Sequence, residues 1–371
     1  MARFIFSVVN HPLISSFATS LVKFAIFLNL PLTPLIRGTV FNHFCGGESI
    51  EEAESTIHHI GGFGVNTILD YSVEGEKSEK GFDNTTREIL KTFEKARSRE
   101  NIPFCVFKVS GVGDTELFEK VQAKKDLTDE EITGLEKVKK RIDKICAKAY
   151  EYDVPVLIDA EESWIQGVLD DMVYEMMERY NQQGSIVFNT YQMYRTDSLF
   201  NLKETLASAQ KRNYYVGAKL VRGAYMEKER DRAEKLGYKS PIFDNKEGTD
   251  RAYNDALMFC IENKDRITTM CGSHNELSNH LLTVEMEKAG MSPSDDRIWF
   301  AQLYGMSDNI SFNLAMEGYN VAKYVPYGPV KSVMPYLLRR AEENTSVAGQ
   351  SSRELTMITK EIKRRKELLK S

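Results

Sequence analysis

Two adjacent arginines, Arg339 and Arg340, are the residues of this 371-residue chain whose type and spacing point most directly to chemistry. They lie in Tyr336–Asn344, which we interpret as a helix. A guanidinium binds a carboxylate through two parallel hydrogen bonds, so the pair predicts a site for a small carboxylate. Glu343 lies four residues after Arg339 and three after Arg340, so it can hold either guanidinium in place.

The position of this helix decides whether the two arginines can act together. Neighbouring helix positions project about 100° apart, so both guanidiniums reach one pocket only if the helix lies over that pocket. A solvated, charged helix is the alternative interpretation. Pro326, Gly328 and Pro329 stand just before the helix and permit a sharp change of chain direction, which favours the helix over a pocket.

A second group of charged residues lies in Lys219–Tyr225. Lys219 and Arg222 place two cations near one strand end, and Gly223 lets backbone or ligand approach closely. Two cations there suit an anionic or electron-rich cofactor. A buried Lys219 or Lys108 could instead form a Schiff base, as in a barrel aldolase.

The elements that must position these residues are eight short apolar runs, most of them followed by helical patterning. Strands that alternate with helices imply parallel pairing, and eight such units favour a distorted (βα)8 barrel over an open sheet, although the count cannot prove closure. We interpret the charged stretch Leu127–Ala149 as an extra outer helix. The runs are Asn66–Asp70, Phe104–Val109, Pro155–Asp159, Ser185–Asn189, Tyr215–Val221, Thr268–Gly272, Arg297–Leu303 and Val321–Val325.

Polar or charged residues stand in, at or just after the ends of these runs. Each could be an ordinary strand cap or rim residue. A barrel, however, gathers the carboxyl ends of all its strands around one pocket, so we expect these residues to lie together. They are Lys108, Asp159, Gln192, Lys219, Arg222, His274, Asn275, Gln302 and Tyr324.

Composition narrows the class of protein. The net charge of −5 argues against a nucleic-acid partner, which would need a basic surplus. Five cysteines without a CxxC pair fit buried free thiols in a reducing compartment, and the histidine spacings do not match a metal site. The glycine-containing segments Gly61–Gly64 and Gly111–Gly113 do not match a dinucleotide fingerprint.

The two ends of the chain are amphipathic. We predict no signal peptide and no membrane span, because the apolar stretch Phe17–Ile36 is interrupted by polar residues and prolines. We divide the chain into a helical segment at 1–60 packed on the barrel, the barrel at 61–345, and a basic helix at 346–371. A helix carrying Phe17, Leu21, Phe24 and Leu28 and the basic helix could instead contact a membrane surface.

Four separated motifs resemble, in order, those of the proline dehydrogenase family. The resemblance runs from about Asp70 to Asn344 and is closer to the stand-alone, mitochondrial-like enzymes than to the bifunctional bacterial ones. It implies a distorted (βα)8 barrel with the last helix over the strand ends, and oxidation of L-proline to Δ1-pyrroline-5-carboxylate. The motifs are Leu157–Glu161, Lys219–Tyr225, Gln302–Asp308, and Tyr324–Pro329 running into Tyr336–Asn344.

The resemblance implies substrate-binding roles for residues that match the family motifs. Arg339 and Arg340 would bind the substrate carboxylate with help from Lys108, and Glu343 would support the arginines. Glu74 would match a gating glutamate that pairs with an arginine when the pocket closes.

Around the substrate ring the resemblance implies a second set of contacts. Tyr324 and Tyr225 would pack against the pyrrolidine ring, Asp159 would orient Tyr225 through a hydrogen bond, and Leu220 would line the pocket. Relatives that prefer hydroxyproline carry a smaller residue at the position of Tyr324, so the tyrosine favours proline.

The cofactor implied by the resemblance is FAD. Lys219 would lie near flavin N5, Gln192 would face the ring, and His274 with Asn275 would contact the pyrophosphate or adenine end. Lys219 and Arg222 are arginine and lysine in the bifunctional relatives. The full cofactor set is Gln192, Lys219, Arg222, Gly223, His274, Asn275 and Gln302.

The implied reaction moves a hydride from the ring carbon next to nitrogen to flavin N5, and a quinone then takes the electrons. We therefore expect a cytoplasmic enzyme that can touch the cytoplasmic membrane without spanning it. Three alternatives stay open: a Schiff-base lyase or aldolase that uses Lys108 or Lys219, a relative that oxidises hydroxyproline, and a non-catalytic barrel that binds proline analogues.

Overall fold

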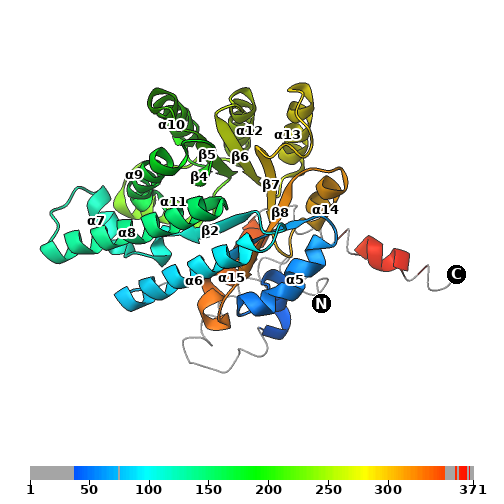
Figure 1. The fold of residues 1–371 in the computed structure, drawn as a ribbon, viewed down its shortest axis with the longest axis horizontal. Helices are drawn as coiled ribbons and strands as arrows, with labels where there is room; N and C mark the ends of the chain where they lie inside the picture. Colours follow the sequence, from blue (N-terminus) through cyan, green and yellow to red (C-terminus); the bar gives the residue numbers. More distant parts are fainter. Residues whose placement is uncertain (1–36, 74–75, 347–355, 357–358, 366, 368–371) are drawn as a thin grey trace.

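Eight parallel strands form a closed barrel in the computed structural model, which describes residues 37–73, 76–346, 356, 359–365 and 367 (Figure 1). Each strand pairs with the next in the chain, and β8 pairs with β1. The predicted barrel is therefore confirmed and an open sheet is excluded. The strands are β1 Asn66–Tyr71, β2 Phe104–Lys108, β3 Val156–Asp159, β4 Val187–Gln192, β5 Val216–Val221, β6 Ile267–Gly272, β7 Ile298–Leu303 and β8 Val321–Tyr327.

The strand ends coincide with those of the apolar runs or differ from them by up to three residues. Gln192, predicted to follow the fourth strand, is its last residue, because its backbone pairs with Val221 of β5. Tyr327 likewise extends β8 by pairing with Tyr71 of β1. Backbone pairing with a neighbouring strand carries each element beyond the point at which its apolar pattern stops.

Helices surround the strands (Figure 1). Between successive strands the chain forms one or two helices, and α15 follows β8. The helices after β1 are α6 Glu79–Arg97, α7 Thr115–Gln122, α8 Asp129–Tyr152, α9 Ser163–Tyr180, α10 Ser198–Arg212, α11 Met226–Leu236, α12 Lys246–Glu262, α13 Glu276–Lys288, α14 Asp308–Met316 and α15 Val330–Ser346.

The interpretation of Leu127–Ala149 as an extra outer helix was wrong. This stretch is α8, which lies between α6 and α9: Arg141 binds Asp83 of α6, and Asp143 binds Arg179 of α9. The added helix is the shorter α7, whose Gln122 side chain is hydrogen-bonded to the start of α9. Sequence charge misled the prediction, because the charged residues of α8 cover one face while its apolar residues are buried against the barrel.

Helix α5, Ile50–Gly61, packs on β1 and β8 before the barrel begins. Its Glu54 pairs with Lys95 and Arg99 at the end of α6, and Phe63 just after it meets Phe312 of α14 edge-to-face at 5.2 Å between ring centroids. Helix α5 therefore fills the outer position between α14 and α6, so α15 is left to pack elsewhere.

Inward and outward side chains alternate along each strand and form two apolar cores. The outer core lies between strands and helices and includes Leu69, Val156 and Ala218. Inside the barrel, Phe104 meets Phe188 and Trp299 edge-to-face, with ring centroids 5.6 and 5.1 Å apart. These aromatic rings fill the interior near the amino ends of the strands and leave the carboxyl ends for polar side chains.

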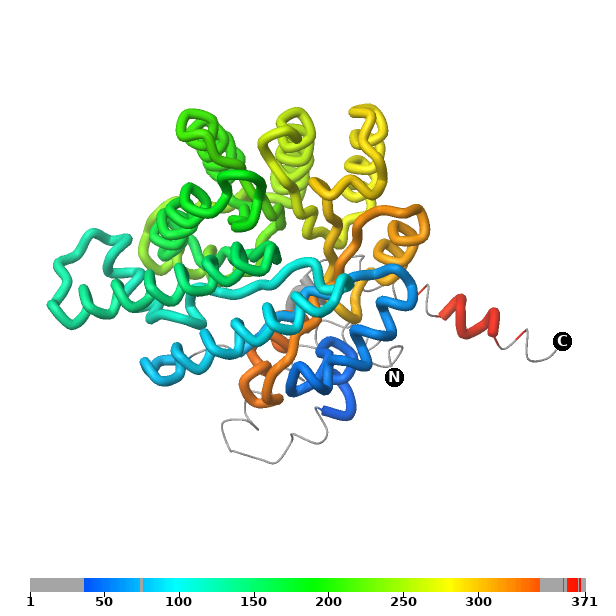
Figure 2. Tube along the Cα trace, viewed as in Figure 1, coloured from blue at the N-terminus to red at the C-terminus, as the bar shows by residue number. Residues whose placement is uncertain are grey.

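The segment at 41–47 and helix α15 lie beside the carboxyl end of β8 (Figure 2). The Gly46 amide donates to the Pro326 carbonyl over 2.8 Å, and the Gly328 amide donates to the Gly47 carbonyl over 3.1 Å. An apolar cluster joins the segment to α15 and to the loop after β7; its members include Phe41, Phe44, Met306, Val333 and Leu337.

The predicted helix with Phe17, Leu21, Phe24 and Leu28 lies outside the described residues. Residues 359–365 near the carboxyl end are helical and mostly exposed, with Glu361 paired to Arg364 and Arg365. Among the helices that the structure describes, none is both long and apolar enough to cross a membrane. All five cysteines are buried as free thiols, as the sequence predicts.

Candidate active site

The mouth of the barrel at the carboxyl ends of the strands carries ionisable side chains from four strands. Strand alternation turns Asp70 of β1, Lys108 of β2 and Asp159 of β3 inward, because each is two residues beyond an inner-core residue of its strand. Lys219 of β5 is also inward, because its neighbours Ala218 and Leu220 lie in the outer core. Tyr324 of β8 joins them from the inner core. Four of these five residues were predicted from strand ends; Asp70 was not assigned a role.

Asp159 connects the two inward lysines. Its Oδ2 accepts from Lys108 Nζ at 2.9 Å and its Oδ1 accepts from Lys219 Nζ at 2.6 Å. Burial alone would raise the pKa of Asp159, but the two ammonium groups lower it to about 2. The carboxylate is therefore ionised throughout the neutral range, and it holds both cations at one side of the mouth.

Tyr324 forms an aromatic wall beside this cluster. The Lys219 ammonium lies 4.3 Å from the centroid of the ring, a cation–π contact. The Tyr324 hydroxyl is buried and has no hydrogen-bond partner within the described part of the chain. Burial raises the pKa of Tyr324 well above its usual value, so the hydroxyl stays protonated and can donate to a ligand.

Helix α15 reaches from β8 to the far side of the mouth. The Arg339 guanidinium carbon lies 5.9 Å from the ring centroid of Tyr225, which follows β5. Arg340 is 8 % exposed, and its charge is one of those that lower the pKa of His274, which follows β6. The paired arginines thus lie over the strand ends and not in bulk water, as the sequence predicts.

Tyr225 is buried between the mouth and α15, but Asp159 does not hold it in place. Both carboxylate oxygens of Asp159 bind lysines, and the predicted hydrogen bond from Tyr225 to Asp159 is absent among the described residues. The prediction is corrected for a physical reason: two buried ammonium groups bind a carboxylate more strongly than a neutral phenol does.

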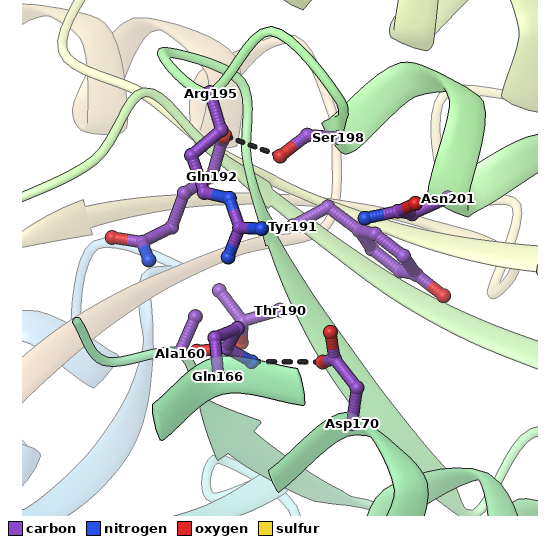
Figure 3. A pocket seen from close by; sticks show the side chains of 9 residues that line it. All are labelled: Ala160, Gln166, Asp170, Thr190, Tyr191, Gln192, Arg195, Ser198 and Asn201. Atoms are coloured by element: carbon purple, nitrogen blue, oxygen red, sulfur yellow. Dashed lines mark hydrogen bonds between the residues drawn. The ribbon is translucent and has the colours of Figure 1, made fainter. Parts of the chain in front are cut away.

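Gln192 lies at the end of β4, beside a small polar cavity between β4 and the helices α9 and α10 (Figure 3). Its Nε2 donates to the Glu161 carbonyl over 2.7 Å, and its amide oxygen has no partner within the residues described. In the cavity wall Asp170 accepts from Gln166 and Asn189, each over 2.8 Å. Burial raises the pKa of Asp170 to about 6 and that of Glu161 to about 7.

Sequence reasoning assigned no role to these two acids. Asp170 lies in α9 and accepts a hydrogen bond from Asn189 on the outer side of β4. An aspartate within a helix carries no sequence signal that it is buried. Glu161 stands two residues after Asp159, inside a motif already quoted, in the connection between β3 and α9. The Ser110 amide, from the turn after β2, donates to its Oε1 over 2.9 Å.

His274, Asn275 and Arg222 meet at the start of α13. The Asn275 side chain caps the helix by accepting from the Ser278 amide at 3.0 Å. His274 Nε2 accepts from the Leu303 amide, so Nδ1 carries the proton toward Ser307 Oγ at 2.9 Å. Burial and then the nearby cations Lys323, Arg340 and Arg222 lower the pKa of His274 to about 3, so it is neutral.

Arg222 points away from the barrel axis. Its guanidinium binds Asp250 at 2.8 Å, Ser273 Oγ at 2.8 Å and Ser278 Oγ at 2.9 Å, and it stacks on Tyr253 at 4.4 Å from the ring centroid. These contacts place the cation beside the amino terminus of α13, where the helix dipole also favours an anion.

Two residues expected in the pocket lie on the outer side of their strands. Leu220 alternates with the inward Lys219 and is buried in the outer core, so it does not line the mouth. Gln302 donates to the Ser273 carbonyl over 3.1 Å and accepts from Ser311 Oγ over 2.8 Å, which places it between β7 and the helices α13 and α14. Both predictions are corrected: parity along the strand decides which side chains face the pocket.

Two further predictions cannot be placed. Glu74 and the side chain of Glu343 lie outside what the structure describes. Their expected roles stay predictions.

The chain is similar to known proteins over most of its length. A family model described as proline dehydrogenase matches residues 53–353. The chain belongs to the proline dehydrogenase family. It is 33 % identical over 382 residues to "Proline dehydrogenase 1, mitochondrial" of Dictyostelium discoideum, which covers 91 % of this chain and 67 % of that protein.

Two further relatives are similar to different shares of this chain. It is 34 % identical to the carbapenem antibiotics biosynthesis protein CarD of Pectobacterium carotovorum, with 87 % of this chain and 83 % of that protein covered. The human "Proline dehydrogenase 1, mitochondrial" is 39 % identical over 241 residues, which cover 64 % of this chain and 40 % of that protein.

Solved structures share the barrel fold of this chain. Proline utilization A of Bdellovibrio bacteriovorus, inactivated by N-propargylglycine, superposes with a TM-score of 0.74 at 22 % identity over 83 % of this chain. The present chain spans about a third of the length of that protein, since 33 % of it is covered. At this identity the likeness establishes the barrel architecture alone.

Proposed function

We propose that this chain oxidises L-proline to Δ1-pyrroline-5-carboxylate with FAD as its cofactor and a quinone as the electron acceptor. The observation that carries the proposal is the pair of guanidiniums on α15 above a mouth that already contains a buried, ionised Asp159 and two lysines. Family membership supports the proline class of substrate.

The carboxylate of the substrate would bind Arg339 and Arg340, whose charges stand above the mouth at the ends of β5 and β6. Bidentate guanidinium contacts would fix the carboxylate and therefore the orientation of the ring. Tyr324 and Tyr225 would pack on the ring and exclude water. Holding the ring in one orientation would be the main contribution of these residues to the rate. Lys108 would add a third positive charge nearby.

The amine of proline must be neutral when the C–H bond breaks, because its lone pair forms the new C=N bond. Proline therefore binds deprotonated or first loses one ammonium proton to water. A hydride equivalent then leaves the ring carbon next to nitrogen that carries no carboxylate, and the iminium formed loses its N–H proton to water to give the imine. Asp159 cannot take that proton near neutral pH, because its pKa is about 2. We therefore propose that the residues of the mouth orient the substrate and do not act as a base.

The residues present fit an FAD. Bound FAD would supply the acceptor for the two electrons of the C–H bond. The amide oxygen of Gln192 can accept from a ring N–H, and the Lys219 ammonium suits the negative charge of a reduced ring. Gly223 has φ of +132°, and an added Cβ would clash with the Tyr194 ring, so this position requires glycine.

The phosphate end fits the start of α13. His274, Asn275 and Arg222 surround that helix terminus, which combines backbone N–H groups, a helix dipole and a guanidinium. We leave Gln302 out of this set, because it faces the outer helices.

Purified protein tests the proposal directly. We expect a yellow protein whose flavin absorbance bleaches on anaerobic addition of L-proline and returns on addition of a soluble quinone. Mass analysis of the released cofactor separates FAD from FMN, and a colourless active protein would refute the flavin assignment. Reoxidation by oxygen but not by quinone would refute quinone as the electron acceptor. It would also remove the reason to expect contact with a membrane surface.

The lysines argue against a Schiff-base enzyme. Lys108 and Lys219 both bind the Asp159 carboxylate, so forming a Schiff base on either amine would break a buried ion pair. Burial lowers the pKa of Lys219, and the Asp159 carboxylate opposes that shift. Borohydride in the presence of substrate would trap an adduct on either lysine if this alternative were correct.

Tyr324 carries the proposed preference for proline over hydroxyproline. We expect Tyr324→Ser to lower the ratio of kcat/KM for L-proline to kcat/KM for 4-hydroxyproline by roughly tenfold, because the variant leaves room for the hydroxyl. Tyr71→Ser, which alters a partly buried tyrosine outside the mouth, is the control. An unchanged ratio in the Tyr324 variant would remove this residue from substrate selection.

A further inference from the structure

Helix α11, directly after the β5 strand end, is held to the barrel in an unusual way. Eight of its eleven residues are charged, and its described residues include two fully buried ones, Ala233 and Glu229. Its largest apolar side chain at the far end, Leu236, is 62 % exposed. Apolar burial therefore contributes little to docking this helix, and polar contacts must fix its position.

Glu229 makes the central contact. Its Oε1 accepts from the Ser163 amide and its Oε2 accepts from the Ser163 hydroxyl, both over 2.6 Å. Ser163 is the first residue of α9, and the preceding Glu162 makes no side-chain capping bond within the described residues. Glu229 thus caps α9 from another helix, and the positive end of the α9 dipole offsets the buried carboxylate.

Two further contacts support the same joint. Lys228 binds Glu162 at 2.7 Å, and the Arg232 guanidinium lies 4.5 Å from the centre of the Trp164 indole ring. All three contacts join α11 to the first turn of α9, whose strand β3 ends at Asp159 four residues earlier.

These contacts between α11 and α9 begin within one helical turn of Tyr225. Tyr225 is the residue before α11, and its carbonyl accepts from the Glu229 amide over 2.9 Å. The ring of Tyr225 faces Arg339 on one side and Lys228, 5.4 Å from its centroid, on another. A shift of α11 against α9 would therefore move the Tyr225 ring relative to Arg339 and to the strand that carries Asp159.

We propose that Glu229 is a positioning residue for Tyr225: by capping α9 it fixes the start of α11 and holds the Tyr225 ring against the substrate. This inference rests on the proposed function of the mouth. Glu229 itself touches neither the mouth residues nor α15 in any described contact, so its effect on the substrate must pass through Tyr225.

The test compares Glu229→Ala, Glu229→Gln and Tyr225→Ala in the flavin-loaded enzyme. The probe is a saturated five-membered-ring carboxylate with oxygen in place of nitrogen, which can bind but cannot be oxidised. We expect Glu229→Ala to weaken its binding and lower kcat/KM for L-proline by roughly 10- to 100-fold, as misplacement of an orienting group does. Glu229→Gln keeps an acceptor for the Ser163 amide and should stay within about threefold of the wild type.

A double variant shows whether Glu229 acts through Tyr225 or whether the loss comes from general destabilisation of the fold. In the Tyr225→Ala background, Glu229→Ala should cause no further loss of binding, since two residues that act through one ring are not additive. Asn181→Ala is the matched control, because Asn181 is also fully buried and bonds the Val187 and Tyr215 carbonyls at the opposite end of the barrel. It should lower Tm and leave binding of the probe unchanged.

Hydrogen–deuterium exchange of residues 224–229 gives a readout that does not depend on the reaction. Faster exchange there in Glu229→Ala, with unchanged exchange in β5, is expected even if the wild type failed to oxidise proline, an outcome that would refute the proposed function alone. Unchanged exchange, or full additivity of Glu229→Ala with Tyr225→Ala, would overturn the positioning role.

Discussion

Replacement of Arg340 by alanine is expected to lower kcat/KM for L-proline by roughly 100-fold or more, because truncating one side of a buried, charge-assisted pair costs about 3 kcal/mol. Arg340 of α15 is nearly buried, so the charge it offers a carboxylate is weakly screened by solvent. Arg339, which is more exposed and lies over Tyr225, should give a loss of the same direction and smaller size.

Arg340→Lys discriminates charge from geometry. Lysine keeps the positive charge and loses the planar fork, so it should recover only part of the activity. Pyrrolidine, which is proline without its carboxylate, tests the assignment most sharply: wild type and Arg340→Ala should oxidise it at the same low rate. Arg179→Ala, a change to an exposed arginine of α9, is the control. Equal losses for proline and pyrrolidine would place Arg340 in folding or cofactor binding.

The barrel itself could be predicted because each strand is a short apolar run followed by a helix. Strands buried on both faces do not alternate apolar and polar residues, however, so the sequence does not reveal which residues face inward. Leu220 was assigned to the pocket by the family resemblance and Gln302 by its place in the seventh strand run, and strand parity could not check either assignment. In the structure Lys219 and Ala301 face inward, so their neighbours Leu220 and Gln302 face outward.

The partners of Asp159 illustrate a second limit. A motif identifies an acidic residue at a strand end, but it cannot show which of several residues from other strands will contact it. Two lysines, 51 and 60 positions away in the chain, occupy its oxygens, and Tyr225 does not. Helix α5 is a third case: nothing in its sequence shows that it takes the outer position between α14 and α6 and so leaves α15 to cross the mouth.

Replacement of Asp159 by asparagine is expected to be the most destabilising single change at the mouth, by about 3 kcal/mol. The substitution preserves shape and removes the charge that compensates Lys108 and Lys219. Lys219 is almost completely buried, with a side-chain exposure of 7 %, so its ammonium would be left in a poorly solvated place. Chemical denaturation at neutral pH measures the loss. Glu175→Gln, which removes an exposed pair with Arg179, should cost under about 1 kcal/mol.

The difference in unfolding free energy between wild type and Asp159→Asn depends on pH, because Asp159 titrates at different pH in the folded and unfolded protein. The pKa of Asp159 is about 2 in the folded protein and lies near 3.8 when the chain unfolds. Its stabilising effect is therefore complete above about pH 4 and is lost as the pH falls toward 2, which amounts to about 2 kcal/mol. The gap in unfolding free energy between wild type and Asp159→Asn should narrow over that range. A constant gap would mean that the pairing with the lysines does not set the stability of the mouth.

A second substitution shows whether the loss comes from the uncompensated cation. Removing one partner of a buried ion pair is costly, whereas replacing both by uncharged groups of similar size is often neutral. Asp159→Asn combined with Lys219→Met should therefore be more stable than Asp159→Asn alone, although neither variant should oxidise proline well. If the double variant is instead less stable by the sum of the two single losses, the ion pair is not the source of the effect, and the cost of Asp159→Asn must come from the packing of the carboxylate itself.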